Sequence, residues 1–555
     1  MNAEVRATPT SEGPGGAAPS VAAGRWRRAG LVAGWTAVVA PFLIEAVAIV
    51  RASQVWLVDR TPDDAFYYLE IARRIDHGQG LTFDGIDATN GFHPLWQALL
   101  AAVGLVVGGQ TAFIKVDLLV CLALTLAAVL LLIRVVWRWL GPGAALMGAV
   151  VAVHGRAALP GLADGMEGAL SVFTLAVLVT VLVWWFEAPS RRRAVAMGAI
   201  SAAVVLARLD MVVVIWLVPV AMVWRARSWR MLPAYAAGAA VGIPWAAWYW
   251  IRYHHLLTTS ATIKQLEMTT LAHHDGGRLS VGYLRYVWAN GADCVRSVLH
   301  LAWDSVWSPG SALGVLVGVS LIGLAGLGVV VLSRSWVGHA APAWALGTSL
   351  VMLGAKAAFD LYTVPTWADS WYLTPQRVAV PFALGALAWL GGREMVRRWP
   401  PVGVVAVAVL CVVGLPLTLS NVTESPSTRV DAASWQGQIG LAADWVVAHG
   451  PPGRYGADDA GLLGYRLDGT HPVVDVDGLV DNYRYAALVA RGSTLRQQLA
   501  ATGVDVYVNR IHPSQLAALG CARVLWRSPN QVAVLEGGTT LDRAPVDVLD
   551  VRRCR

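Results

Sequence analysis

The sequence contains little charge. Charged residues make up 14% of the 555 residues, whereas hydrophobic residues make up 56%. Soluble globular proteins carry about 25% charged residues, so this composition excludes a cytosolic enzyme, a disordered hub and a nucleic-acid-binding protein. It suits a polytopic membrane protein, in which the lipid-facing side chains must be apolar as well as the core.

Lysine is scarce as well. Lys115, Lys264 and Lys356 are the three lysines, and the other basic residues are arginines. The formal net charge of +7 is small and fits cytoplasmic loops better than a polyanionic partner. Tryptophan outnumbers phenylalanine by 26 to 9, which is typical of a protein with many membrane interfaces.

The five cysteines form no CxxC motif, which disfavours a metal or redox site. Cys121 and Cys411 lie in apolar runs and are expected to be inert. Cys521 and Cys554 lie in the C-terminal segment, where they can pair if that segment faces an oxidising compartment.

The basic clusters predict the topology. Residues 1–28 read as a disordered cytoplasmic tail rather than a cleavable signal. Placing the arginine clusters in the cytoplasm gives about eleven crossings, with the N-terminus inside and the C-terminus outside a plasma membrane. The predicted spans are 29–50, 113–136, 143–160, 166–186, 194–207, 211–224, 231–251, 311–332, 339–358, 371–391 and 401–420. The apolar run 93–109 is expected to be re-entrant or interfacial, because counting it as a crossing would invert every later loop.

Two of these spans are unusually short. The runs 194–207 and 211–224 are below the ~20 residues that a crossing needs, and Arg208 and Asp210 lie at their junction. Charges inside an apolar run are costly unless they are paired or functional. Arg208 is therefore expected either to form a structural ion pair with Asp210 or to reach a phosphate in a buried polar cavity.

The predicted fold class is an all-α polytopic membrane domain over residues 29–420, followed by a soluble α/β domain over 421–555. Strands are expected at 453–457, 472–476 and 504–508, alternating with helices that include 432–449 and 484–500, a pattern typical of α/β domains. The membrane domain carries two further outer segments, 51–92 and 252–310. We expect all three outer segments to be extracytoplasmic.

Two adjacent carboxylates, Asp63 and Asp64, follow Pro62 in the first outer segment. Proline and acidic residues both favour a helix start, so the pair is either an ordinary charged helix start or a base or cation ligand held at the membrane surface.

The stretch DDAFYYLEIARR (63–74) and the following GLTFDGIDATNGFHPLW (80–96) resemble the first extracytoplasmic loop of GT-C glycosyltransferases. That superfamily includes protein O-mannosyltransferases, aminoarabinose transferases and mycobacterial arabinofuranosyltransferases, which use a polyprenyl-phosphate sugar as donor. The resemblance covers roughly residues 60–210 and implies an inverting transferase for an envelope glycan, lipid or protein acceptor. It also implies that Asp63-Asp64 is the acidic pair of this loop, with Asp63 as the base and Asp64 orienting it or holding the acceptor or a cation.

The chemistry of such a transfer predicts further site residues. A carboxylate takes the proton of the acceptor hydroxyl, and cationic groups stabilise the leaving lipid phosphate. The stretch Gly165-Met166-Glu167 resembles the loop in which GT-C enzymes carry a second acidic position. The resemblance implies a second acidic site at Glu167, with Asp164 as the alternative, and either position can also be a solvated loop tip. The donor-phosphate candidates are Lys264, which ends the hydroxyl-rich run 258–264, together with Arg377, Arg208 and His93. Each of these four residues also has an alternative without a function in binding. Lys264 can be an ordinary loop lysine and Arg377 an arginine at the membrane interface. Arg208 can form an internal ion pair, and His93 can be a structural histidine.

No cofactor is expected to be required, although a divalent cation, Mg²⁺ or Mn²⁺, is an option at Asp64 and Glu167. In the C-terminal segment, Asp475, Asp477 and Asp481 either bind such an ion or form a polar rim. The expected partners are the lipid-linked donor, the acceptor and the bilayer, with no nucleic acid. A transporter or flippase for a lipid-linked glycan, or a scaffold, is the competing hypothesis. One outer cavity that holds both acids and bases favours the enzyme, a midplane pathway favours transport, and dispersed charges favour the scaffold.

Overall fold

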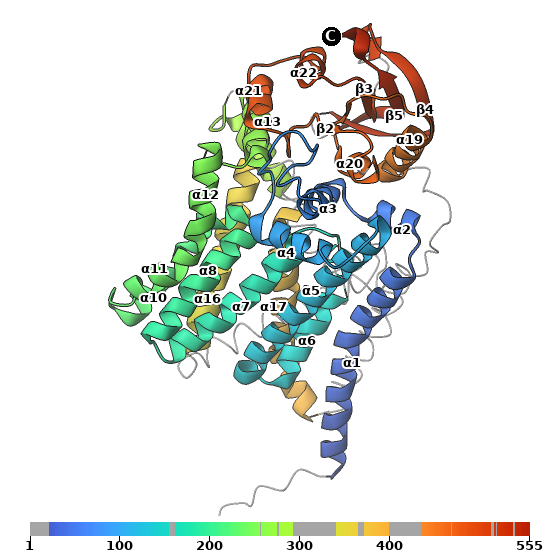
Figure 1. Cartoon of the computed structure of the whole chain (residues 1–555). Coiled ribbons are helices and arrows are strands. Elements are labelled where there is room, and N and C mark those ends of the chain that lie inside the picture. Colours follow the sequence, from blue (N-terminus) through green and yellow to red (C-terminus); the bar gives the residue numbers. More distant parts are fainter. Residues whose placement is uncertain are drawn as a thin grey trace, which may run out of the picture.

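The computed structural model describes residues 21–154, 159, 161–291, 340–364, 371–398 and 434–554, apart from 256, 275–276, 468, 512–515, 518 and 537–538. The predicted spans 311–332 and 401–420 lie outside the described residues. Figure 1 shows a bundle of long helices covered at one end by a smaller C-terminal unit, with α3 between the two.

The first half of the bundle begins with a long helix. α1 starts at Val21, so residues 21–28, which we expected in a disordered tail, are helical. Gly141 joins α5 to α6 in a left-handed conformation, with φ 88°, and Pro142 then opens α6, where its missing N–H costs nothing. The helices are α1 (Val21–Arg51), α2 (Gln54–Arg60), α3 (Asp63–Asp76), α4 (Pro94–Gly104), α5 (Gln110–Leu140), α6 (Pro142–Val153) and α7 (Gly168–Glu187).

The second half contains the predicted break. α8 ends at Ala207, and Arg208 is extended, with φ −151° and ψ 106°, before the chain turns back into the bundle. The elements are α8 (Arg191–Ala207), η1 (Leu209–Met211), α9 (Val212–Ile215), α10 (Leu217–Ala226), α11 (Leu232–Ala239), η2 (Ala240–Gly242), α12 (Ile243–Tyr253), α13 (Thr259–His274), α16 (Ala340–Thr363), η5 (Trp371–Leu373) and α17 (Thr374–Arg398).

α8 and α11 pack backbone to backbone. A Cβ at Gly198 would lie 1.9 Å from the Tyr235 carbonyl oxygen, and one at Gly238 would lie 1.9 Å from that of Val195. Small residues allow this approach between membrane helices, where the hydrophobic effect does not drive association. The two glycines therefore allow α8, which ends at the Arg208 break, to pack in close contact with α11.

Among the described residues, four stretches are long and apolar enough to cross a membrane: Arg28–Arg51, Gln110–Leu140, Gly168–Glu187 and Leu209–Ala226. α4, within the run expected to be re-entrant or interfacial, has 11 residues and is too short to cross, at a rise of about 1.5 Å per residue. It packs against α3, α5 and α8 at the end of the bundle beneath the C-terminal unit.

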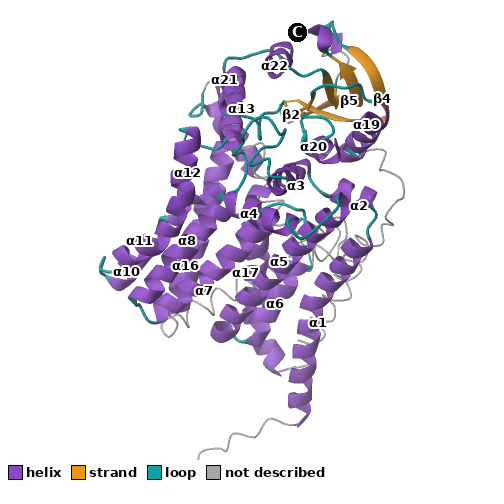
Figure 2. Cartoon of the chain, viewed as in Figure 1, coloured by secondary structure: helices purple, strands orange, loops and turns teal. Residues whose placement is uncertain are grey.

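The C-terminal unit is built on a five-stranded sheet with the order β2-β1-β3-β5-β4. β1, β2 and β3 are parallel, and β5 runs antiparallel to both β3 and β4. Figure 2 shows these strands together at one end of the molecule. The elements are α19 (Trp435–His449), β1 (Tyr455–Ala457), α20 (Gly461–Leu467), β2 (Val473–Asp475), α21 (Tyr483–Ala490), α22 (Leu495–Thr502), β3 (Val506–Arg510), β4 (Arg523–Glu536), β5 (Thr539–Asp550) and η6 (Arg552–Cys554).

The C-terminal unit contacts the bundle through buried and partly buried hydrogen bonds. The Tyr67 hydroxyl of α3 donates to Asp475 Oδ1 at 3.2 Å, and Gln110 Nε2 donates to the Tyr465 carbonyl oxygen at 2.7 Å. A Cβ at Gly91 would lie 1.9 Å from the Leu479 carbonyl oxygen. The unit is therefore seated directly on the first outer segment.

Candidate functional site

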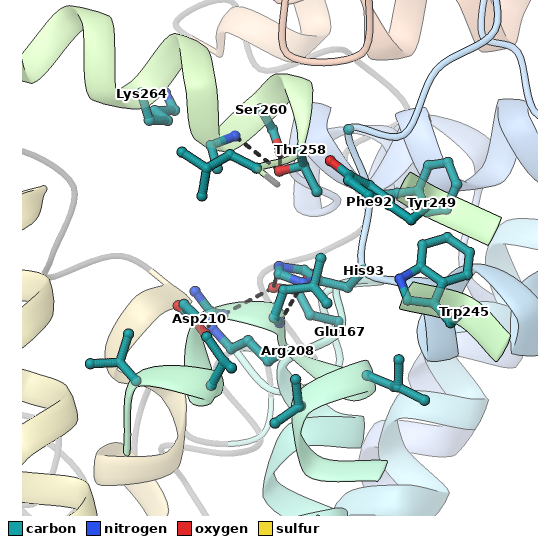
Figure 3. A pocket seen from close by; sticks show the side chains of 18 of the residues that line it. Phe92, His93, Glu167, Arg208, Asp210, Trp245, Tyr249, Thr258, Ser260 and Lys264 are labelled. Carbon is teal, nitrogen blue, oxygen red and sulfur yellow. Dashed lines mark hydrogen bonds and ion pairs between the residues drawn. The ribbon is translucent and has the colours of Figure 1, made fainter. Parts of the chain in front are cut away.

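A cavity of about 650 Å³ lies beneath the C-terminal unit. Its walls come from α3, the 91–93 segment, the 166–167 loop, α8, α9, α12, α13 and α16, and the 479–480 segment covers it. Figure 3 shows His93, Glu167, Arg208 and Asp210 on one side of the cavity and Thr258, Ser260 and Lys264 on the opposite side. Acidic and basic groups from distant parts of the chain therefore meet in one place.

The two adjacent aspartates at the start of α3 have different environments. Asp63 Oδ2 accepts the Gly461 N–H at 2.7 Å, and Asp63 Oδ1 accepts the Leu462 N–H at 2.9 Å. These bonds satisfy the first turn of α20, and Asp63 does not line the cavity. Asp64 does line it. The carboxylate available to a ligand is thus that of Asp64, and the expected role of Asp63 as base is not favoured by this geometry.

Burial raises the pKa of the Asp64 carboxyl to about 6, although the nearby Lys264 ammonium lowers it. The carboxylates of Asp459, Glu167 and Glu267 add to the increase. Burial disfavours the charged form of Lys264, but Glu267, Asp477 and Asp64 outweigh this effect and raise the pKa of its ammonium. Lys264 therefore stays positively charged at neutral pH, when Asp64 is mostly deprotonated.

Glu167 is held in a fixed position by three side chains. Arg208 Nη1 donates to Glu167 Oε1 at 2.9 Å, and the Tyr68 hydroxyl donates to Oε2 at 3.1 Å. His93 Nδ1 accepts the Leu209 N–H at 3.1 Å, so Nε2 carries the proton of the neutral ring and lies 3.4 Å from Glu167 Oε1. His93, Glu167 and Arg208, all predicted from the sequence, thus form one cluster.

The ion pairs continue beyond Arg208. The pair of Arg208 with Asp210 was one of our two hypotheses, whereas the participation of Lys356 and Asp360 was not predicted. Asp210 Oδ2 lies 3.1 Å from Arg208 Nε and 2.8 Å from Lys356 Nζ, and Lys356 also bonds Asp360 on α16. We call Glu167, Arg208, Asp210, Lys356 and Asp360 the charged network. The available signal was Lys356 itself, one of three lysines and placed inside an apolar run.

An aromatic ring covers the two cations of the charged network. The Tyr372 ring centre lies 4.8 Å from the Arg208 guanidinium carbon and 5.8 Å from Lys356 Nζ. Such cation–π contacts stabilise partly desolvated cations. Arg208 therefore forms an internal ion pair, as one of our two hypotheses had it, and also lines the cavity.

The start of α13 faces the cavity opposite the charged network. Thr258 Oγ1 accepts the Ala261 N–H at 3.1 Å, which caps the helix, and lies 3.0 Å from Ser260 Oγ. Ser260 and Lys264 are four residues apart, so they share one helix face, and both line the cavity. Hydroxyls, an ammonium and the positive end of a helix dipole suit an anion.

The cavity extends along the bundle as an apolar groove. Its walls there come from α8, α9 and the α11–α12 segment, and the lining residues include Val205, Leu206, Val213, Ile215, Ala239 and Trp245. Figure 3 places Trp245 and Tyr249 beside the polar part of the cavity. A ligand with a charged head and an apolar chain matches this division.

Two predicted residues lie elsewhere. Arg377 is a half-buried residue of α17 and is not among those that line the cavity. Asp164 lies in the loop before Glu167, where it accepts the Met166 N–H at 2.9 Å, and burial raises the pKa of its carboxyl to about 7. Neither is brought into contact with the anion-binding side of the cavity.

Within the described part of the chain, no group of three or more His, Cys, Asp or Glu residues could hold a metal ion. Both oxygens of Glu167 are already engaged by Arg208 and Tyr68. Asp475 accepts the Tyr67 hydroxyl and the Val480 N–H. These donor sets do not fit a divalent cation, so no step of the chemistry below is assigned to one.

Cys521 and Cys554 form a disulfide, with a Cα–Cα distance of 5.2 Å. Cys121 is a buried free cysteine. The pairing, which the sequence left as a possibility, is present, and it attaches η6 to the segment before β4.

No protein-family model and no curated protein matches the sequence. Among solved structures, ArnT from Cupriavidus metallidurans matches in its apo state with 16% identity and a TM-score of 0.40, covering 91% of this chain and 97% of its own. ArnT bound to undecaprenyl phosphate matches with 15% identity and a TM-score of 0.40, covering 92% and 98%. An oligosaccharyltransferase from Archaeoglobus fulgidus, in complex with zinc and sulfate, matches with 12% identity and a TM-score of 0.45, covering 85% and 68%.

At TM-scores below 0.5, the matches establish neither the reaction of this chain nor the residues of its site. The functional interpretation therefore rests on the cavity.

Proposed function

We propose that this protein is a membrane-embedded, inverting glycosyltransferase that transfers a monosaccharide from a polyprenyl-phosphate donor to an acceptor hydroxyl. The observation that carries the proposal is the cavity, where Asp64 lies within electrostatic reach of Lys264 and the polar space joins an apolar groove. A lipid phosphate sugar has these three parts: an apolar chain, an anionic phosphate and a reactive sugar.

On the donor side, the leaving phosphate is assigned to Ser260 and Lys264 at the start of α13. A lysine acts as a point charge toward phosphate, and hydroxyls donate hydrogen bonds to its oxygens. The polyprenyl chain lies in the groove between α8, α9 and α12. Lys264 thereby stabilises the negative charge that develops as the bond to the sugar breaks.

On the acceptor side, Asp64 is the general base. Its carboxylate takes the proton of the acceptor hydroxyl while that oxygen attacks the anomeric carbon. The new carbon–oxygen bond forms as the bond from the anomeric carbon to the phosphate oxygen breaks, and polyprenyl phosphate leaves with the bonding electron pair. Attack opposite the leaving group inverts the anomeric configuration.

The charged network has a supporting role in this proposal. Arg208 and Lys356 are each 1% exposed and bonded to carboxylates, so they fix one wall of the cavity. Lys264 also pairs with a carboxylate, that of Glu267 at 3.7 Å, but its side chain is 14% exposed, and we assign the phosphate to it. Arg377, outside the cavity lining, has no role here.

Transport is less well supported than transfer. A transporter is expected to carry its charges along a midplane pathway. Here, one cavity beneath the C-terminal unit is lined by both acids and bases: Asp64, Glu167, Arg208, Asp210, Lys264 and Asp360. The disulfide adds support for an extracytoplasmic position of the C-terminal unit, because disulfides persist in oxidising compartments. We place the acceptor on that side, in the cell envelope.

The test is sugar transfer by the purified protein in lipid nanodiscs. A panel of polyprenyl-phosphate monosaccharides is offered with acceptor-rich envelope extract, and Asp64→Asn is compared with Asp87→Asn, which changes an exposed aspartate of the same outer segment. We expect wild type and Asp87→Asn to transfer one sugar, and Asp64→Asn to be slower by about 10²–10⁴. Absence of transfer from every donor would contradict the proposal.

A further inference from the structure

A set of hydrogen bonds connects the C-terminal unit to the bundle beside the cavity. The Tyr483 hydroxyl donates to the Leu257 carbonyl oxygen, and it lies 2.8 Å from Asn90 Nδ2 and 2.7 Å from the Tyr249 hydroxyl. One hydroxyl has one proton to donate and two lone pairs to accept with. With Asn90 and Tyr249 as donors, the Tyr483 hydroxyl is fully satisfied.

The same connection continues into the first residue of α13. Asn90 Oδ1 accepts the Thr259 N–H at 3.1 Å, and the Thr259 hydroxyl donates to the Leu479 carbonyl oxygen at 3.0 Å. Both Asn90, with 0% of its surface exposed, and Thr259, with 1%, are buried. The first turn of α13 is thus bonded both to the first outer segment and to the C-terminal unit.

The side chains that form these hydrogen bonds lie outside the face of α13 that is assigned to phosphate. Asn90, Thr259 and Tyr483 do not line the cavity, whereas Ser260 and Lys264 do. Because side chains on a helix keep fixed angles to one another, holding Thr259 against the C-terminal unit sets the direction in which Ser260 and Lys264 point.

We propose that Tyr483, Asn90 and Thr259 are positioning residues, through which the C-terminal unit holds the start of α13 in its phosphate-binding orientation. This inference rests on the proposed function. It makes the C-terminal unit part of the donor site, without any contact between these three residues and the donor.

The experiment measures binding of undecaprenyl phosphate to the full-length protein in nanodiscs, and KM for donor and for acceptor. Tyr483→Phe removes three hydrogen bonds while keeping the ring, and Thr259→Val removes the hydroxyl with little change of volume. Thr259→Ser restores the hydroxyl. Tyr485→Phe is the matched control, because the Tyr485 hydroxyl, as far as the described residues go, bonds within the C-terminal unit, to the Val476 carbonyl oxygen.

We expect Thr259→Val to bind undecaprenyl phosphate about five- to tenfold more weakly, the change that loss of one buried hydrogen bond produces. Tyr483→Phe loses three hydrogen bonds and should bind at least as weakly. The donor KM should rise by the same factor and the acceptor KM should not change. Thr259→Ser and Tyr485→Phe should bind as wild type does. A purely structural role would instead lower the melting temperature and affect both substrates.

Three results would overturn the inference. If wild type binds the probe and both variants bind it equally well, the inference fails and the proposed function stands. An equal loss in Tyr485→Phe would mean a general effect on the C-terminal unit. If wild type binds no undecaprenyl phosphate and transfers no sugar, the inference falls together with the proposed function.

Discussion

Asp63 and Asp64 are neighbours in the chain, yet only one of them is exposed to the cavity. The carboxylate of Asp63 is occupied by two N–H groups of α20, and that of Asp64 faces the cavity. Two residues in succession on a helix point about 100° apart. The sequence identified the pair, but assigning the roles required the position of Gly461, almost 400 residues away in the chain.

In the proposed mechanism, the buried carboxyl of Asp64 gives transfer a defined pH dependence. Its pKa is raised to about 6, and the base works only when deprotonated, so activity is lost as pH falls through 6 and is full above about pH 7. We expect kcat/KM to rise with pH and to level off with an apparent pKa near 6, which a pH–rate profile between pH 4.5 and 8 measures. A profile that is flat across this range would contradict the assignment.

The charged network makes Lys356 important for stability. Lys356 is 1% exposed and bonds both Asp210 and Asp360. Lys356→Met therefore removes the cation bonded to Asp360 and leaves Asp210 with Arg208. Breaking such a buried pair costs about 3–5 kcal/mol, which thermal melting in detergent would register as a large decrease in melting temperature. The double variant Lys356→Met/Asp360→Leu should recover part of the loss, and no recovery would contradict the pairing.

At the scale of elements, the predicted helix break and strands were confirmed, because they depend on local sequence patterns. The break between 194–207 and 211–224 lies at Arg208 as expected. Strands β1, β2 and β3 lie in or beside the predicted runs. The helix predicted over 484–500 was wrong in extent. It is two helices, α21 and α22, separated at Gly492, whose φ of 71° ends the first.

Other elements could not be predicted from local patterns. The hairpin of β4 and β5 has register shifts along its length, so its residues lack a regular alternation. The meeting of η1 and α16 at the charged network depends on packing between segments about 150 residues apart in sequence. Long-range contacts of this kind leave no periodic signal in either segment.

The close packing of α8 against α11 yields a test at this scale. Gly198→Ala places a Cβ 1.9 Å from the Tyr235 carbonyl oxygen, whereas Gly242→Ala places one 3.6 Å from the Ala202 Cβ, an ordinary contact. We expect Gly198→Ala to lower the melting temperature clearly and Gly242→Ala to leave it nearly unchanged. Equal melting of the two variants would show that α8 and α11 are not packed this closely.

At the scale of the whole molecule, the C-terminal unit forms a cover over the cavity and is seated on α3 through Asp63 and Tyr67. The sequence indicated a separate composition for this part of the chain. It could not indicate that the 479–480 segment of the unit lines the same cavity as Asp64, because that depends on how the two parts pack together.

The disulfide of the C-terminal unit is a second test at this scale. Cys521 and Cys554 are 33 residues apart. A disulfide that closes a loop of that size stabilises the folded protein by about 2–4 kcal/mol. We expect both cysteines to resist thiol alkylation until the protein is reduced, and Cys521→Ser to lower the melting temperature of the unreduced protein. Alkylation of either cysteine in the folded, unreduced protein would contradict the pairing.

The most direct measurement of the central claim compares Asp64→Asn with Asp63→Asn in the same nanodiscs, with transfer and melting measured on each. Asp64→Asn removes a buried negative charge, so it should melt at or above the wild-type temperature while transfer falls by at least about a hundredfold. Asp63→Asn loses one of two bonds to α20, so it should melt lower and retain transfer per folded molecule. The reverse pattern, an inactive but stable Asp63→Asn and an active Asp64→Asn, would contradict the account.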